Sequence, residues 1–217
     1  MISSSFIKGM ITLFIKRVVQ RTAPRAIVAM TAVGGPFDYQ AQFHHMETEV
    51  IGTEIPVATI EMLDIANSLP RNPSKSYPVR NPSIVTGYVV HHTGVPPQEP
   101  IVIAKYHINK KGWAGIAYHF GIYKGKVLIL NDVSVISNHT AGRNTKNVGV
   151  VVFGDYRKMP PSKEDLKALQ FLDDHLDKNG IKSMTWHRAV KATECPGDSL
   201  ILFLKTMKRN ELLVSNE

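Results

Sequence analysis

The stretch Val148-Gly149-Val150-Val151-Val152-Phe153 decides the fold of this 217-residue chain. It is a continuous apolar run, which predicts a central strand buried on both faces. A second run, Tyr88-Val89-Val90, predicts another short strand that ends at His91-His92. Helical patterns on both sides of these runs place the chain in the α/β class.

The segments around these two strands complete the predicted domain, residues 84–217. A Lys124-Gly125 turn between two apolar runs predicts a hairpin, and Ser162 before a leucine-rich stretch predicts a capped helix. We therefore expect a mixed central sheet flanked by helices. The remaining predicted elements are helices over 100–110 and 198–209, the two hairpin strands over 117–123 and 127–130, and a last strand over 184–187.

The part before residue 84 is harder to interpret. Residues 71–83 are proline-rich and basic, which predicts a linker or an extended strap. Residues 1–70 then form an N-terminal extension of unknown structure, with a short helix expected over 59–67. Apolar residues recur at helical spacing over 6–21, so this segment is expected either to pack on protein or to lie on a membrane surface.

Composition excludes several classes of protein. The chain is 43% hydrophobic and 20% charged, as in ordinary globular proteins, and its single cysteine excludes an intramolecular disulfide. The net charge of +8 suggests an anionic partner. Aromatic and basic residues do not alternate as in single-strand binders, so we predict no nucleic-acid partner. No apolar run reaches the ~18 residues of a membrane span, and no clear signal peptide is present.

The single cysteine, Cys195, lies eight residues after His187, and His91-His92 lies far upstream. Neutral imidazole and thiolate are both good zinc ligands, and three protein ligands leave a fourth position open to water. The residues alone leave an alternative open, namely a buried free cysteine with hydrogen-bonded core histidines. Strand alternation sends His91 and His92 to opposite faces, so only one of them can join the site.

Five ordered motifs carry a family resemblance over roughly residues 84–207. The motifs are Val89-Val90-His91-His92-Thr93, Gly112-Trp113-Ala114-Gly115-Ile116-Ala117-Tyr118-His119-Phe120, Asn138-His139-Thr140-Ala141-Gly142, Asn147-Val148-Gly149-Val150, and His187-Arg188 followed by Cys195-Pro196-Gly197-Asp198. Together they resemble the zinc-dependent N-acetylmuramoyl-L-alanine amidases, which include amidase-type phage lysins and peptidoglycan recognition proteins.

The resemblance implies a Zn²⁺ cofactor held by His91, His187 and Cys195, with Tyr118 as a catalytic residue. Thr193 stands where many phage amidases have a lysine, and its hydroxyl is expected to help stabilise the transition state. The expected substrate-binding residues are His139, Arg188 and Asn144. Arg188 is equally expected to orient the loop after His187, and His119 is expected to point away from Tyr118.

The expected reaction is hydrolysis of the amide bond between N-acetylmuramic acid and L-alanine in peptidoglycan, for cell-wall lysis. The alternatives are a peptidoglycan-binding module without catalysis, which Thr193 favours, and a structural component anchored through residues 1–70. That anchor would attach to a membrane surface or to a larger, phage-like assembly. By analogy with phage lysins, we expect a protein made in the cytoplasm that acts on the cell wall, either free or carried by a virion.

Overall fold

The computed structural model describes residues 59–214, with side chains through residue 207. Six strands of this part form one sheet in the order β1-β4-β3-β5-β2-β6. Only β3 and β4 pair antiparallel, while every other neighbouring pair is parallel, so the sheet is mixed as predicted. The strands are β1 (Met62–Asp64), β2 (Gly87–His92), β3 (Phe120–Tyr123), β4 (Lys126–Ile129), β5 (Asn147–Val152) and β6 (Ser183–Trp186).

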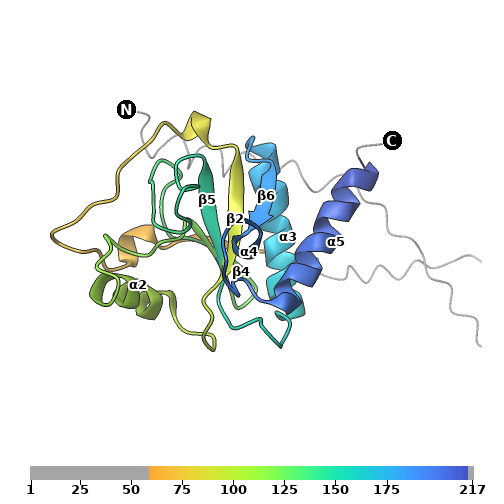
Figure 1. The fold of residues 1–217 in the computed structure, drawn as a ribbon, viewed down its shortest axis with the longest axis horizontal. Coiled ribbons are helices and arrows are strands. Elements are labelled where there is room, and N and C mark those ends of the chain that lie inside the picture. The colour runs from red at the N-terminus through yellow and green to blue at the C-terminus, as the bar shows by residue number, and fades with distance from the viewer. Residues whose placement is uncertain (1–58, 215–217) are drawn as a thin grey trace, which may run out of the picture. The chain divides into compact units, whose positions relative to one another are not determined.

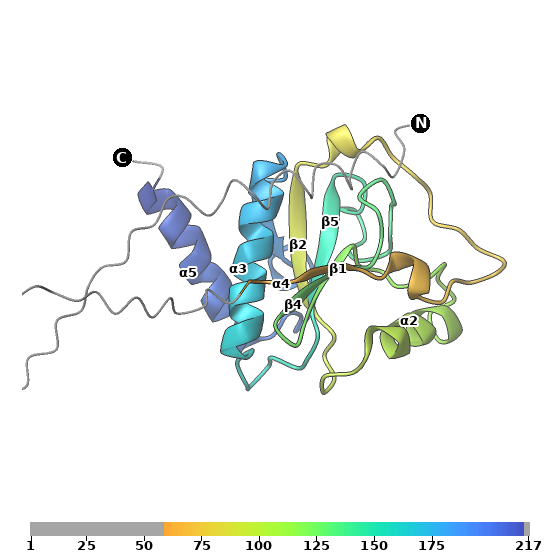
Figure 2. The same ribbon diagram turned by 180° about the vertical axis from the view of Figure 1, so that it is seen from behind.

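Helices cover both faces of the sheet, as Figures 1 and 2 show. Helix α2 (Pro100–Asn109) lies on one face, and α3 (Lys163–Lys178) and α5 (Asp198–Val214) lie on the other. A short helix, α4 (His187–Val190), follows β6 directly. Two 3₁₀ turns, η2 (Ala66–Ser68) and η3 (Pro82–Ile84), precede β2.

The central strand β5 is buried on both faces, which explains why the apolar run contains no polar residue. Val148, Val150 and Val152 belong to the core cluster that includes the buried face of α3, whereas Val151 belongs to the cluster that includes α2. All four side chains are at most 1% exposed. Alternate residues of the strand therefore enter two separate apolar cores.

Helix α3 begins and ends where the sequence predicts. The Ser162 hydroxyl accepts a hydrogen bond from the Asp165 amide at 3.0 Å, and Gly180 follows the helix with a left-handed φ of +83°. The sequence pattern places Asp165 at the reciprocal capping position, three residues after Ser162. Its carboxylate instead accepts the Gly125 amide at 2.8 Å, so it joins the helix to the β3–β4 turn.

The expected helix over 59–67 is wrong. Residues 62–64 form β1, which pairs in parallel with β4 at the edge of the sheet, and η2 follows. The backbone there bonds to a neighbouring strand, a tertiary contact that local propensity does not encode. The sheet thus includes residues before 84, where the sequence placed the start of the domain.

Residues 71–83, called the strap below, run along two loops of the domain. The Asn72 amide bonds to the Ala114 carbonyl at 2.9 Å, and the Tyr77 hydroxyl bonds to the Gly115 carbonyl at 2.8 Å. Val79 forms an antiparallel bridge with Val135. The strap is therefore hydrogen-bonded to the segment that carries Tyr118 and to the loop after β4.

Two expectations concern membranes. The predicted amphipathic helix over 6–21 lies outside the described residues. Within residues 59–214, no helix is both long and apolar enough to cross a bilayer.

Candidate metal site

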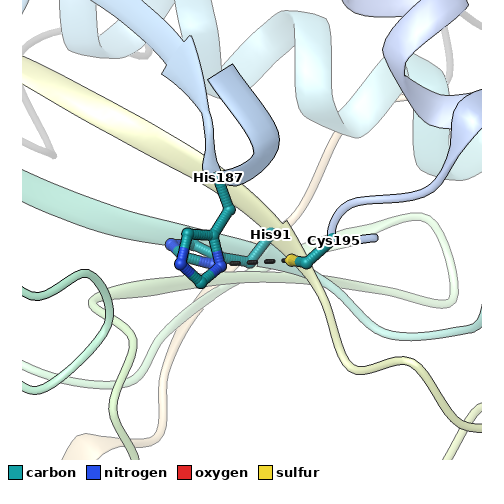
Figure 3. A group of neighbouring side chains, drawn as sticks. All are labelled: His91, His187 and Cys195. Carbon is teal, nitrogen blue, oxygen red and sulfur yellow. Dashed lines mark hydrogen bonds between the residues drawn. The ribbon is translucent and has the colours of Figure 1, made fainter. Parts of the chain in front are cut away.

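Three candidate ligands meet at one edge of the sheet. His91 is the last residue but one of β2, His187 directly follows β6, and Cys195 lies in the loop before α5. Because β2 and β6 are parallel neighbours, their carboxyl ends lie side by side. One ligand atom from each of the three residues lies within 4.8 Å of the others (Figure 3).

The side chains of His91 and His92 have different surroundings in the structure. His91 pairs with Val151 in the sheet and is 1% exposed, and its Nδ1 lies 3.6 Å from the Cys195 sulfur. The His92 ring lies near Tyr156, and its Nδ1 accepts the Tyr156 amide at 3.2 Å. His92 is therefore committed to a backbone hydrogen bond, and its side chain is not one of the three that converge.

The Cys195 loop is held by backbone and arginine contacts. The Arg188 amide donates to the Cys195 carbonyl at 2.8 Å, and the His92 amide donates to the sulfur at 3.4 Å. Gly197 has a φ of +92°, and a Cβ there would lie 2.3 Å from the Tyr156 carbonyl carbon and oxygen. Only glycine allows the chain to pass Tyr156 so closely after the cysteine.

The donor set fits zinc. Tetrahedral zinc with Zn–N of about 2.05 Å and Zn–S of 2.3 Å separates its nitrogen and sulfur ligands by about 3.6 Å. The observed distance between His91 Nδ1 and Cys195 Sγ is 3.6 Å. Two imidazoles and one thiolate are ligands that zinc accepts, and they leave one tetrahedral position for a fourth group.

Burial keeps these groups neutral in the absence of a cation. It raises the pKa of the Cys195 thiol to about 12 and lowers the pKa of His91 well below its usual value, an effect that the neighbouring histidines reinforce. The pKa of His187 is also lowered by burial, then by Lys191. Neutral imidazoles are ready to donate a lone pair, whereas the thiol ionises only if a positive charge stabilises it.

Tyr118 lies beside the three candidate ligands. Its ring centroid is 5.3 Å from that of His91 and 5.6 Å from that of His107, which in turn packs against Trp113. The Tyr118 hydroxyl forms no hydrogen bond with any of the described residues. Burial, with smaller contributions from Cys195 and Tyr77, raises the pKa of the Tyr118 phenol. The phenol thus stays protonated and keeps a hydrogen to donate.

His139 and Thr140 lie behind His91. Nδ1 of His139 is 3.4 Å from Nε2 of His91, and the Thr140 hydroxyl lies 3.2 Å from the same nitrogen. On its far side, His139 Nε2 lies 3.2 Å from the Asn147 carbonyl. Burial lowers the pKa of His139 to about 3. His139 therefore contacts the candidate ligand His91, whereas the sequence predicted a substrate contact, which stays a prediction.

The other predicted site residues, Thr193, Arg188 and Asn144, form hydrogen bonds with the backbone of nearby loops. The Thr193 hydroxyl accepts the Cys195 amide at 3.2 Å, which leaves its own hydrogen free to donate elsewhere. Arg188 donates to the Thr193 and Glu194 carbonyls at 3.1 and 2.7 Å, the orienting role expected for it. The Asn144 side chain accepts the Thr140 amide at 2.7 Å. A substrate contact by any of these three residues stays a prediction.

His119 packs behind His139, with 5.8 Å between the two ring centroids. It is fully buried, accepts the Gly149 amide at Nδ1 and donates to the Val135 carbonyl from Nε2.

Gly149 and Thr140 are two residues to which the sequence assigned no role. A Cβ on Gly149 would lie 2.7 Å from the His139 ring, so the glycine makes room for that histidine. Their positions inside the Asn-His-Thr and Asn-Val-Gly-Val motifs were the only available signal.

The comparisons with known proteins agree with this geometry. The family profile described as N-acetylmuramoyl-L-alanine amidase matches residues 80–198, so the chain belongs to that family. Peptidoglycan-recognition protein LB of Drosophila melanogaster is 34% identical over 102 residues, which are 44% of this chain and 43% of that protein. N-acetylmuramoyl-L-alanine amidase of Sus scrofa is 27% identical over an alignment of 139 residues that covers 55% of this chain and 23% of that protein. The chain thus matches less than half the length of either relative.

Among solved structures, the Ph2119 endolysin from Thermus scotoductus MAT2119 bacteriophage Ph2119 superposes with a TM-score of 0.59 at 28% identity. The superposition covers 67% of this chain and 97% of the endolysin. The described fold is therefore shared with nearly the whole of that endolysin chain.

Proposed function

We propose that this protein is a zinc-dependent N-acetylmuramoyl-L-alanine amidase that cleaves peptidoglycan. The observation that carries the proposal is the convergence of His91, His187 and Cys195 within 4.8 Å at one edge of the sheet. Family membership and the likeness to a phage endolysin support the same reaction. The two relatives above are named for peptidoglycan recognition and for the amidase reaction, which favours peptidoglycan as the partner.

The residues of the site have separate roles in this proposal. His91, His187 and Cys195 would hold the zinc ion. When bound, zinc supplies a Lewis acid for the amide carbonyl and lowers the pKa of water toward neutrality. The thiolate and two neutral imidazoles leave a net positive charge at the site, which favours the developing oxyanion.

Tyr118 and Thr193 would act on the substrate directly. The unpaired Tyr118 hydroxyl is a hydrogen-bond donor for the carbonyl oxygen of the amide between the lactyl group and L-alanine. The Thr193 hydroxyl already accepts the Cys195 amide, so only its hydrogen remains available for that oxygen. As negative charge develops on the oxygen, both donors would stabilise it more strongly than they bind the neutral amide.

A peptidoglycan-binding module without catalysis is the second candidate. The observation that favours it is Thr193, because a hydroxyl brings no positive charge where many phage amidases have a lysine. Cys195 favours the enzyme, because a thiolate is the ligand that completes the zinc site. Anchoring through residues 1–70, contact with a membrane or a larger assembly, and action outside the cell on the wall stay predictions.

The test couples metal content to turnover. The purified chain is assayed for zinc, and then for release of new L-alanine amino groups from purified peptidoglycan, with and without a chelator. We expect one zinc per chain and release that stops with chelator and returns with added zinc. Zinc binding without release would favour the binding module, and a chain that takes up no zinc would contradict both the zinc site and the amidase.

The matched variants are His187→Ala and His175→Ala. His175 lies in α3, away from the candidate ligands, so its loss should leave zinc uptake and release unchanged. His187→Ala removes one of three ligands and should abolish release. Equal activity in the two variants would contradict the assignment.

A further inference from the structure

Arg80, in the strap, is a buried cation without an acidic partner. The residue is 8% exposed, and none of the ion pairs among the described residues includes it. Its guanidinium donates instead to backbone carbonyls, and its Nη2 also lies 3.3 Å from Nε2 of His119. Nε bonds to Val133 at 2.9 Å, and Nη1 bonds to Thr145 and Asn147 at 3.1 Å each and also to Asn144. A buried charge is costly without an anion, so this arrangement calls for an explanation.

One of these carbonyls also receives a hydrogen bond from His139. The Asn147 oxygen lies 3.2 Å from Nε2 of His139. A carbonyl can only accept, so Nε2 of His139 carries the hydrogen and Nδ1 has the free lone pair. Arg80 and His139 thus bond to the same oxygen from different parts of the chain.

The lone pair of His139 faces the candidate ligand His91. Nδ1 of His139 lies 3.4 Å from Nε2 of His91, and the Thr140 hydroxyl lies 3.1 Å from the first nitrogen and 3.2 Å from the second. Both neighbours can accept a hydrogen from His91 Nε2. That tautomer leaves the lone pair on Nδ1, which is the nitrogen 3.6 Å from the Cys195 sulfur.

We propose that Arg80 is a positioning residue for the metal site, acting through the Asn147 carbonyl and His139 on the orientation and tautomer of His91. The inference rests on the proposed zinc site and extends it by three hydrogen-bonded steps into the strap. Groups that hydrogen-bond directly to a metal-ligating histidine typically change metal affinity or activity by 10- to 100-fold when removed. Arg80 lies further out, so its effect should fall at the lower end of that range. This positioning role also gives a function to the buried Arg80 guanidinium, on which four backbone carbonyls converge.

The test compares Arg80→Met with Arg71→Met in the full chain. Arg71 is the matched control, because it is also a strap arginine, bonded to the Asn131 side chain at 2.5 Å and to the Leu130 carbonyl at 3.3 Å. No hydrogen bond of Arg71 leads to His139. The zinc dissociation constant is measured by competition with a chromophoric chelator, and thermal unfolding of the metal-free proteins reports any loss of stability.

We expect Arg80→Met to weaken zinc binding about tenfold, the lower end of the range for direct partners of a ligand, and Arg71→Met to weaken it less than about twofold. If Arg80→Met does not fold, Arg80→Lys replaces it, since one ammonium cannot span the same carbonyls and should give a smaller loss in the same direction. Equal zinc affinity in the Arg80 and Arg71 variants would overturn the proposal.

A double-mutant cycle identifies the route. In a His139→Ala background, adding Arg80→Met should change zinc affinity less than about twofold, because the connection to His91 is already broken. A full Arg80 effect in that background would refute the route through His139. Release of alanine is measured in parallel. A wild-type chain that binds zinc but releases nothing would overturn the amidase, while the ratios of zinc affinity would still decide the role of Arg80.

Discussion

Replacement of Tyr118 by phenylalanine is the sharpest test of the proposed chemistry. The change removes one hydroxyl and keeps the ring that packs against His91 and His107. The hydroxyl has no hydrogen bond to any described residue, so its loss leaves no buried group unpaired. Folding stability should therefore change by less than about 0.5 kcal/mol, the range of substitutions that remove no internal interaction.

The effect on catalysis should be much larger. Loss of one preorganised donor to a developing oxyanion costs about 10²–10³ in turnover, or about 2.7–4 kcal/mol. If the hydroxyl acts only in the transition state, kcat and kcat/KM should fall equally while KM and zinc affinity stay unchanged. The measurement is the rate of alanine amino-group release from peptidoglycan against substrate concentration, together with a zinc titration.

Tyr123→Phe is the matched control, because its hydroxyl donates to the Glu99 carboxylate at 2.9 Å on the exposed side of the hairpin. Removing it should leave release unchanged. Two results would refute the assignment of Tyr118, namely full turnover in Tyr118→Phe or an equal loss in both variants. A fall in zinc affinity would instead make Tyr118 a support for the ligands.

Three further predictions concern the same region. Cys195→Ser should weaken zinc binding at least tenfold and stop release, because a serine hydroxyl ionises far less readily than a thiol. An unchanged zinc affinity, measured by chelator competition, would contradict the ligand assignment. Gly149→Ala should destabilise the metal-free protein by about 1–3 kcal/mol, because the new Cβ would lie 2.7 Å from the His139 ring. If urea unfolding shows that the free energy of unfolding falls by less than about 0.5 kcal/mol, the ring moves freely. Burial lowers the pKa of His107 to about 4 and of His119 to about 3, so between those values and about 6.5 the unfolded chain binds more protons. Stability should then fall as the pH drops below about 6.5, by up to about 1.4 kcal/mol per pH unit for each histidine, and pH-independent unfolding over that window would contradict their neutral burial.

Much of the fold could be predicted from local signals. The apolar run of β5, the serine cap of α3 and the Lys124-Gly125 turn are each written in a few adjacent residues, and the structure has all three. Strand alternation also predicted that only one of His91 and His92 could join the site, and the family resemblance selected His91. These features depend on periodicity and backbone preference, which act over a few residues.

The edge strand β1 and the contacts of the strap were not predictable in the same way. Residues 62–64 become a strand because β4 offers them a backbone partner more than 60 residues away. The roles of Thr140, Gly149 and Arg80 likewise arise from groups brought close by folding. Motif membership marked Thr140 and Gly149 without assigning them a role, and no local pattern marked Arg80.

The sequence by itself determined the class of fold, the family and the identity of the three candidate ligands, because motifs and periodicities are carried by residue type and spacing. Only the tertiary structure decided that His91, His187 and Cys195 meet, and that His139 faces a ligand. It also decided that a strap arginine shares a carbonyl with that histidine. Distances between side chains on separate strands and loops depend on how the sheet aligns its carboxyl ends, and this alignment is a property of the folded chain as a whole.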